Sequence, residues 1–116
     1  KITFLGTGTS QGVPVIACEC PVCLSADFRD KRLRTSVLIE TTEVTILIDA
    51  GPDFRQQMLR EHVRKLDAIL ITHEHKDHIA GMDDVRAFNH RSQKAVDVYA
   101  EERVQKTIKR DRKSVV

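Results

Sequence analysis

The order of hydrophobic and polar residues predicts five β-strands. Each segment either alternates between apolar and polar side chains or is a short apolar run rich in β-branched residues. The segments are residues 1–5, 36–40, 44–49, 66–72 and 96–100. The turn Thr41-Thr42-Glu43 separates the second segment from the third and predicts a β-hairpin. Asp49 ends the third segment, and an acid there is costly unless it is paired, caps a helix or turn, or lies near a cation.

Three other segments have patterns typical of helices, at residues 52–63, 83–88 and 101–109. Pro52 and Asp53 suit the first turn of the first helix, and apolar side chains that follow them share one face. The last segment begins with acids and ends with bases, which complements the helix dipole.

Composition places the chain among small soluble proteins. A length of 116 residues allows one domain, and a hydrophobic content of 41% is enough for a modest core. The net charge of +2 is too small to indicate a nucleic-acid partner, and the absence of Trp leaves little aromatic surface for base stacking. No apolar run approaches the ~20 residues that span a bilayer, and no export signal is visible. We therefore expect a cytoplasmic protein without membrane contact.

Three histidines and two acids follow one another closely after an apolar run, in a segment that we call the histidine loop (residues 72–78). In an extended loop, His73 and His75 project to the same side and can reach one cation. Asp77 and His78 are adjacent and diverge, which suits ligands of a second cation. Imidazole together with carboxylate fits zinc, manganese or iron. The alternative is a polar loop with solvated histidines, but this spacing favours metal binding.

Cys18, Cys20 and Cys23 form a second candidate site. An odd number of cysteines within six positions is unlike the dispersed, even set of a secreted disulfide framework. Three thiolates in one short loop can hold a tetrahedral Zn²⁺ and leave one position for a fourth ligand. We therefore expect a zinc-binding cysteine loop at residues 18–23; the alternatives are free thiols or one oxidised pair.

Three motifs together resemble a known family of hydrolases. The segment Thr72-His73-Glu74-His75-Lys76-Asp77-His78 is similar to the HxHxDH signature of the metallo-β-lactamase-fold hydrolases. The segments Phe4-Leu5-Gly6-Thr7-Gly8-Thr9-Ser10-Gln11-Gly12-Val13-Pro14 and Cys18-Glu19-Cys20-Pro21-Val22-Cys23 resemble the phosphoribosyl cyclic phosphodiesterase branch of phosphonate breakdown. The transfer-RNA 3′-processing endonuclease branch shares the opening Phe4-Leu5-Gly6-Thr7.

This resemblance implies an α/β fold that corresponds to the N-terminal half of an αββα metallo-β-lactamase sandwich, a mixed sheet with helices on one face. Residues 1–116 are then a single half domain with the cysteine loop (residues 18–23) inserted, and residues 110–116 are a tail of no assigned role. We expect the other half either to be missing from this chain or to be replaced by a second copy in a homodimer.

The resemblance also implies a reaction. Two divalent ions, zinc or manganese, hold a bridging hydroxide that attacks phosphorus, so the protein is expected to be a phosphodiesterase on small cyclic or ribose phosphate esters. His73 and His75 bind the first ion, and Asp77 and His78 bind the second. Asp77 and Asp49 are the catalytic acids, and Asp49 acts by orienting the metal site through hydrogen bonds.

A structural zinc ion on Cys18, Cys20 and Cys23 is implied in the same way, closed by a histidine from the C-terminal half. The family pattern also requires further histidines and a bridging aspartate that this chain does not match, so we expect the chain alone to be inactive or feeble. Two other functions stay open: a transfer-RNA 3′-processing endonuclease, and a non-catalytic metal-binding or interaction module.

Four further features are weaker candidates. The glycine loop at residues 6–12 is compatible equally with a plain turn and with phosphate contact. Arg32 and Arg34 belong to a basic run that is most simply solvated, although either could bind phosphate. We expect His62 to be a surface residue and His90 to lie in a solvated loop.

Overall fold

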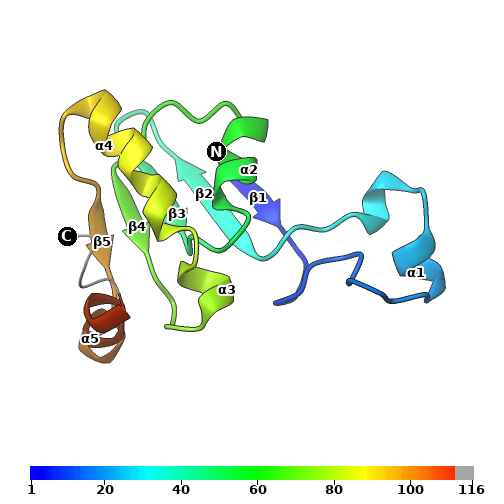
Figure 1. Ribbon diagram of the computed structural model, residues 1–116. Helices are drawn as coiled ribbons and strands as arrows, with labels where there is room; N and C mark the ends of the chain where they lie inside the picture. The colour runs from blue at the N-terminus through cyan, green and yellow to red at the C-terminus, as the bar shows by residue number, and fades with distance from the viewer. Residues whose placement is uncertain (112–116) are drawn as a thin grey trace.

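The computed structural model describes residues 1–111, in which five strands form one mixed sheet (Figure 1). The strands are β1 (Ile2–Gly6), β2 (Ser36–Glu40), β3 (Thr45–Ile48), β4 (Ala68–Leu70) and β5 (Asp97–Tyr99). They follow one another across the sheet; β1, β2 and β3 pair antiparallel, whereas β3, β4 and β5 pair parallel. The expected strands and hairpin are confirmed. Strand β4 is shorter than expected, and beyond its end the Thr72 N–H bonds the Asp49 side chain instead of a neighbouring strand.

The helical elements are α1 (Pro21–Leu24), α2 (Phe54–Arg60), α3 (Lys76–Ile79), α4 (Arg86–Ser92) and α5 (Glu102–Asp111), with the 3₁₀ turns η1 (Phe28–Asp30) and η2 (Met82–Val85). Helix α2 ends earlier than the sequence predicts. His62 has a left-handed φ of 54°, and the N–H of Val63 donates to the carbonyl of Met58 at 3.1 Å. Together these features form a helix-ending motif, which the hydrophobic pattern does not reveal.

The helix expected at residues 83–88 begins as η2 and continues as α4 to Ser92. His90 therefore lies exposed on a helix rather than in a loop, and neither it nor the exposed His62 belongs to the histidine loop. Helix α5 continues to Asp111, so the expected tail at residues 110–116 begins inside a helix; its remainder, residues 112–116, lies outside the described residues.

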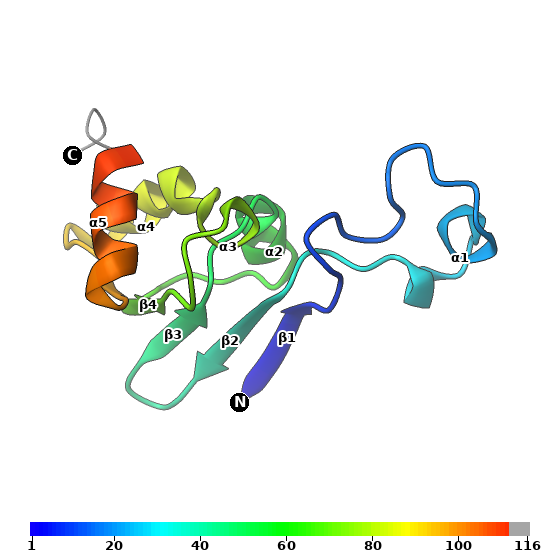
Figure 2. The ribbon, with the colours of Figure 1, turned by 90° about the horizontal axis from the view of Figure 1, so that it is seen from below.

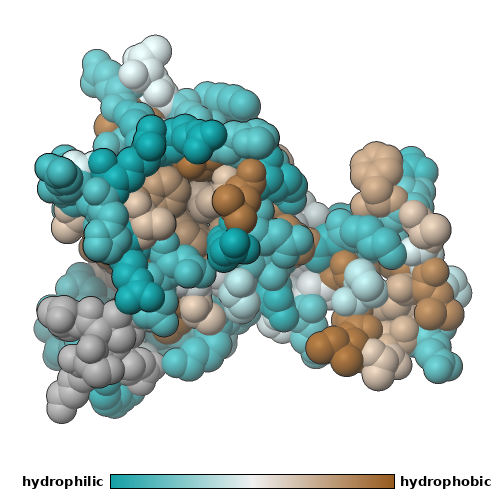
Figure 3. Space-filling model, turned by 45° about the horizontal axis from the view of Figure 1, so that its top comes forward, coloured by the Kyte–Doolittle hydropathy of each residue, from teal (hydrophilic) through white to brown (hydrophobic). Residues whose placement is uncertain are grey.

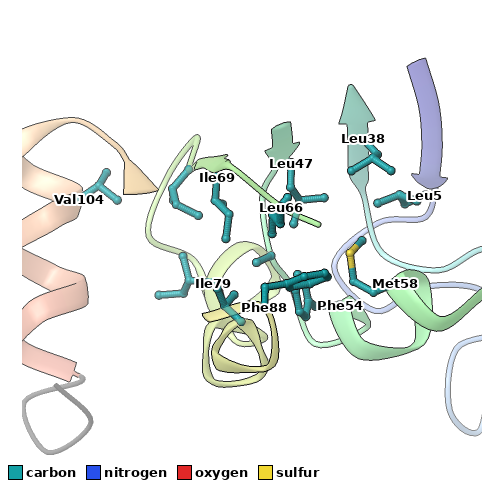
Figure 4. Close-up of a cluster of buried hydrophobic side chains, with 13 residues drawn as sticks. Leu5, Leu38, Leu47, Phe54, Met58, Leu66, Ile69, Ile79, Phe88 and Val104 are labelled. Carbon is teal, nitrogen blue, oxygen red and sulfur yellow. The ribbon is translucent and has the colours of Figure 1, made fainter. Parts of the chain in front are cut away.

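Helices α2, α3, α4 and α5 cover one face of the sheet, and the core lies between the two layers (Figure 2). Leu38 and Leu47 face each other across β2 and β3, and both are at most 1% exposed. Phe54 of α2 and Phe88 of α4 close the core with an edge-to-face contact, their ring centroids 6.2 Å apart (Figure 4). This packing fixes the helices against the strands whose ends carry the histidine loop.

The opposite face of the sheet carries no helix from residues 1–111 (Figure 2). The side chains on this face are largely apolar. One row of facing residues crosses the whole sheet: Phe4, Val37, Ile48, Leu70 and Tyr99. Phe4 is 68% exposed, and Tyr99 is 56% exposed. An apolar sheet face of this extent is where a second layer packs in layered proteins. We call this surface the open face.

The connection between β1 and β2, residues 7–35, forms an arm that projects from the sheet (Figures 1 and 2). A β-bridge between Gly8 and Arg34 joins the two sides of its base. Gly6 is also required there, because a Cβ at this position would lie 2.0 Å from the carbonyl oxygen of Arg34. The glycines thus permit close approach of the chain to itself, which favours the interpretation of a plain turn over phosphate contact.

The arm has little apolar interior of its own. Neither α1 nor η1 contains a buried residue, and Ile16 and Phe28 are 95% and 80% exposed. Hydrophobic side chains accordingly lie on the arm surface, at the right of Figure 3. The fold of the arm therefore depends largely on local hydrogen bonds. No helix within residues 1–111 is long and apolar enough to cross a membrane.

Candidate metal centre

Two side chains meet where the neighbouring strands β3 and β4 end. Because the strands are parallel, their C-terminal ends lie at the same edge of the sheet. Asp49 follows β3, and Thr72 follows β4. The Asp49 carboxylate accepts a hydrogen bond from the Thr72 N–H at 2.8 Å and another from the Thr72 hydroxyl at 2.7 Å. The carboxylate of one residue, whose side chain is only 5% exposed, therefore links the two strand ends.

The backbone of Asp49 is in the left-handed region, with a φ of 64°. Aspartate tolerates this conformation better than most residues with a side chain. The surroundings hold it in place: the Asp49 N–H donates to the carbonyl of Leu70 at 2.9 Å, and the Ser36 hydroxyl donates to the Asp49 carbonyl at 2.9 Å. A strained conformation that is held from both sides is typical of functional sites.

Asp49 also holds His78, which lies on α3. Nδ1 of His78 is 2.7 Å from Oδ2 of Asp49, and because a carboxylate only accepts hydrogen bonds, Nδ1 carries the proton. Nε2 of the same ring faces Oδ2 of Asp77 at 3.0 Å. Two atoms with lone pairs at this separation require a cation between or beside them, either a proton or a metal ion. The separation is close to the roughly 3.3 Å that separates two N or O ligands of a tetrahedral zinc ion.

The three imidazoles of the histidine loop are gathered together. The ring centroid of His73 lies 3.9 Å from that of His78 and 4.6 Å from that of His75. Nδ1 of His73 is 2.9 Å from the Thr72 hydroxyl. Since that hydroxyl donates to Asp49, it accepts from Nδ1 of His73, which leaves Nε2 of His73 free to bind a cation.

Two glycines allow the segment after β3 to lie directly against the histidine loop. The Ala50 N–H donates to the carbonyl of His78 at 2.9 Å, and the Gly81 N–H donates to the carbonyl of Ala50 at 2.9 Å. A Cβ on Gly51 would lie 2.2 Å from the carbonyl oxygen of Asp77, and a Cβ on Gly81 would lie 2.1 Å from that of Gly51. Sequence reasoning missed both glycines, which border the predicted site residues in the chain.

Glu74, between two of the histidines, is held by an element far away in the sequence. Its carboxylate pairs with the guanidinium of Arg103 on α5. A hydrogen bond to its own backbone N–H, together with Arg103, holds the pKa of Glu74 below its ordinary value. Sequence reasoning missed this pair and Thr72, because neither a hydrophobic pattern nor a motif indicates which side chains meet across a fold.

The three cysteines lie on the arm, apart from the histidine loop (Figure 1). Their sulfurs all lie within 4.8 Å of one another, and they form the one such group of three metal-binding donors within residues 1–111. The Cys23 N–H donates to the sulfur of Cys20, which lowers the pKa of Cys20. The Val15 N–H lowers the pKa of Cys23, but the neighbouring thiols and burial outweigh it and raise this pKa overall. The thiols are therefore grouped but unequal.

Arg34 of the basic run has a partner within the chain. Its guanidinium pairs with Asp53 at 3.0 Å and donates to the carbonyl of Ser10 at 2.8 Å. Arg32 donates to the Thr7 hydroxyl at 3.2 Å and is otherwise exposed. The two arginines therefore stabilise the base of the arm, and Arg34 also draws the Asp53 side chain away from a helix-capping role.

Comparison with known proteins places these features in context. Residues 44–115, more than half of the chain, match the family described as beta-lactamase superfamily domain. An octanoyltransferase of Porphyromonas gingivalis is 53% identical over 113 residues, which cover 97% of this chain and 22% of that protein. A ribonuclease Z of Bradyrhizobium diazoefficiens is 39% identical over 83 residues, which cover 70% of this chain and 22% of that protein.

Two solved structures extend the comparison. A crystal structure described as a new diphosphatase from the PhnP family has 47% sequence identity and a TM-score of 0.93, covering 98% of this chain and 46% of that one. Zinc-bound PqqB from Methylobacterium extorquens has 26% identity and a TM-score of 0.78, covering 96% of this chain and 40% of that one. The chain thus spans less than half the length of each of these four proteins.

Proposed function

The chain belongs to the beta-lactamase superfamily, and on this premise we propose that its protein is a metal-dependent hydrolase of phosphate ester or anhydride bonds in small molecules. The main support for this proposal is that the buried Asp49 carboxylate hydrogen-bonds His78 directly. It also contacts His73 indirectly, through the Thr72 hydroxyl. The proposed metal-binding residues are His73, His75, Asp77 and His78.

The donor set of the histidine loop fits divalent ions of the zinc or manganese type. Nε2 of His78 and Oδ2 of Asp77 face each other at 3.0 Å, an arrangement that needs positive charge. Zinc is bound to PqqB, a protein of similar structure, which supports the same chemistry here. Such ions, when bound, lower the pKa of coordinated water and neutralise charge on phosphate oxygens.

The surrounding residues orient the ligands. Asp49 keeps a proton on Nδ1 of His78, and Thr72 keeps one on Nδ1 of His73, so both rings present Nε2. Asp49 is buried, and this makes its hydrogen bonds stronger and its removal more costly than at the surface. In this proposal Asp77 is a ligand, and Asp49 is a positioning residue.

The four proposed ligands are too few for two catalytic ions, since a catalytic zinc ion ordinarily has three protein ligands. The similar proteins are more than twice as long as the part that this chain matches. We propose that the remaining ligands come from polypeptide that packs on the open face. This polypeptide is either a C-terminal half of the same protein or, alternatively, a second copy in a homodimer, and activity of residues 1–116 alone is expected to be feeble.

The proposed substrate class follows from the relative described as a diphosphatase, which has 47% sequence identity. A small cyclic phosphate or ribose phosphate ester presents the same type of phosphorus centre as a diphosphate. The second candidate is processing of transfer-RNA 3′ ends, which is favoured by 39% identity to a ribonuclease Z over 83 residues. The net charge of +2 gives this second candidate little electrostatic support.

A structural zinc ion on Cys18, Cys20 and Cys23 is part of the proposal. It would link the two ends of the arm tip, which lacks a buried apolar core. A fourth ligand is required from outside the three thiols. The odd number of closely spaced cysteines, unlike a secreted disulfide framework, also favours the cytoplasm as the location.

The proposal can be tested with the complete protein that contains this chain. We would measure zinc and manganese content, then hydrolysis of bis(4-nitrophenyl) phosphate, a cyclic nucleotide, a nucleoside diphosphate and precursor transfer RNA. His75→Ala and Asp77→Ala should lose both active-site metal and turnover. His90→Ala, which alters an exposed histidine on α4, is the matched control and should retain both.

Each outcome separates the candidates. Turnover of the small phosphates without RNA cleavage supports the main proposal, whereas the reverse preference supports transfer-RNA processing. A fully metal-loaded protein that cleaves none of these compounds would leave a non-catalytic metal-binding module and overturn the hydrolase assignment.

A further inference from the structure

An ion pair joins helix α5 to the histidine loop. Val104 is fully buried in the core and fixes the helix on the sheet (Figure 4). The adjacent Arg103 extends its guanidinium to the carboxylate of Glu74. Glu74 lies between His73 and His75, so this contact reaches the part of the chain that carries two proposed ligands of one ion.

The surroundings of Glu74 make it depend on Arg103. The Glu74 side chain is 25% exposed, whereas that of Arg103 is 63% exposed, so the carboxylate is the more desolvated partner. One of its oxygens, Oε2, is buried and has no hydrogen-bond partner among the described residues. When a partly buried carboxylate already lacks a hydrogen-bond partner on one oxygen, removing its paired cation costs a large amount of free energy.

We propose that Arg103 is a positioning residue of the metal centre: by holding Glu74, it fixes the backbone between His73 and His75 and thereby the direction of both imidazoles. This inference rests on the proposed function, because it assumes that the two histidines bind metal. It assigns a role to a residue of α5, an element that contributes no proposed ligand.

The role follows from geometry and charge. His73 and His75 flank Glu74, so any rotation of the Glu74 peptide units turns both rings. With Arg103 removed, the Glu74 carboxylate would lose this ion pair and would be free to turn towards a cation on the histidines. Partners that orient metal ligands typically contribute about 10- to 100-fold in metal affinity, and we expect Arg103 to lie in that range.

The test compares variants of the complete protein. Zinc affinity would be measured by competition with a chelating dye, and the ligand geometry by the visible spectrum of the Co²⁺-substituted protein. Arg103→Gln should bind zinc about 10-fold or more weakly and shift the Co²⁺ spectrum, and Arg103→Lys should restore part of the affinity. In a Glu74→Ala background, Arg103→Gln should have no further effect, because the two residues act as one unit.

Lys106→Gln is the matched control. It removes another cation of α5, one that pairs with Glu102 at 3.3 Å with both side chains exposed, and it should change neither affinity nor spectrum. The inference is overturned if Arg103→Gln lowers the thermal unfolding temperature but leaves zinc affinity and the Co²⁺ spectrum unchanged, or if the Arg103 and Glu74 effects add. If His73→Ala and Asp77→Ala leave zinc binding unchanged, the proposed function is refuted instead.

Discussion

Nδ1 of His78 lies 2.7 Å from Oδ2 of Asp49, and through this contact the end of β3 determines which nitrogen of the imidazole is free. The same carboxylate accepts two hydrogen bonds from Thr72 at the end of β4. The orientation of the proposed ligands thus depends on a residue that reaches them from a different strand.

Asp49→Asn is expected to weaken metal binding by about 10- to 100-fold. Asparagine accepts the left-handed backbone at this position, so the change removes the charge without adding backbone strain. Zinc affinity from dye competition tests this expectation. A urea titration on the same samples should show a loss of about 1–3 kcal/mol in unfolding free energy, because a buried hydrogen-bonded charge is removed. Unchanged metal affinity would show that His78 keeps its orientation without Asp49.

Thr72→Val should also weaken metal binding, because it deprives both the Asp49 carboxylate and Nδ1 of His73 of a hydroxyl. Thr72→Ser is the matched control, since it keeps the hydroxyl and removes only a methyl group. We expect the serine variant to bind zinc nearly as well as the wild type. Equal losses in the two variants would show that the hydroxyl does not orient the ligands, because the serine variant retains it.

The sequence predicts the fold well because the alternation of apolar and polar residues within each short segment identifies the strands. Alternation places Leu38 and Leu47 towards the core, and they lie buried and opposed across the hairpin. Element ends are less predictable. His62 ends α2 through a left-handed conformation, and no apolar pattern records this. The fold class and the family are confirmed, whereas the metal-binding roles of the site residues stay predictions.

In the candidate site too, residues that are close in the sequence can be predicted, whereas contacts between distant residues cannot. His73, His75, Asp77 and His78 are recognisable because they are close in the sequence. Contacts such as Arg103 with Glu74 join residues from separate elements, and only the folded chain brings them together. Glycines that allow close approach, such as Gly51, carry no chemical signal in a single sequence.

Gly51→Ala and Gly81→Ala are expected to destabilise the protein, because each new Cβ would meet backbone atoms that have no room to move. We expect each variant to lose about 1–3 kcal/mol of unfolding free energy in urea, typical of overpacking. Ala80→Ser changes an exposed neighbour by one atom and serves as the control, with a loss below about 0.5 kcal/mol. Wild-type stability of the glycine variants would show that the two loops can separate.

The three thiols should react at different rates. In metal-free protein, Cys20 is expected to be alkylated fastest by iodoacetamide, because it is exposed and its pKa is lowered. Cys23, whose pKa is raised, should react slowest. Added zinc should protect all three, and peptide mass spectrometry after timed quenching measures each rate. Equal rates that zinc does not alter would exclude a shared metal site.

Asp67 should contribute stability that disappears in acid. Its carboxylate accepts from the Thr45 N–H at 2.7 Å, and this bond, with Lys65, lowers its pKa. A lowered pKa in the folded state adds stability above the pKa of the unfolded state, and this stability is lost as pH falls through the folded pKa. The Asp67→Asn variant should therefore have a lower unfolding free energy than the wild type at pH 7, measured by urea titration. Below about pH 4, its unfolding free energy should fall less steeply with pH than that of the wild type.

Asp97→Asn is the control for that comparison, because Asp97 is an exposed acid on the neighbouring strand β5. Its acid profile should follow that of the wild type. If Asp67→Asn and Asp97→Asn give the same profile, the hydrogen bond to Thr45 does not stabilise the parallel pairing of β3 and β4.

The open face also governs how residues 1–111 behave at high concentration. Phe4 and Tyr99 lie at opposite ends of a continuous row of apolar side chains, and both are exposed. This apolar surface is in contact with water unless another layer covers it. Molecules whose open face is uncovered will associate with one another through this face, because association removes apolar surface from water. The dependence of aggregation on protein concentration therefore shows whether the open face is covered. A preparation that stays monodisperse implies a covering layer, whereas turbidity that rises with concentration implies that the layer is absent.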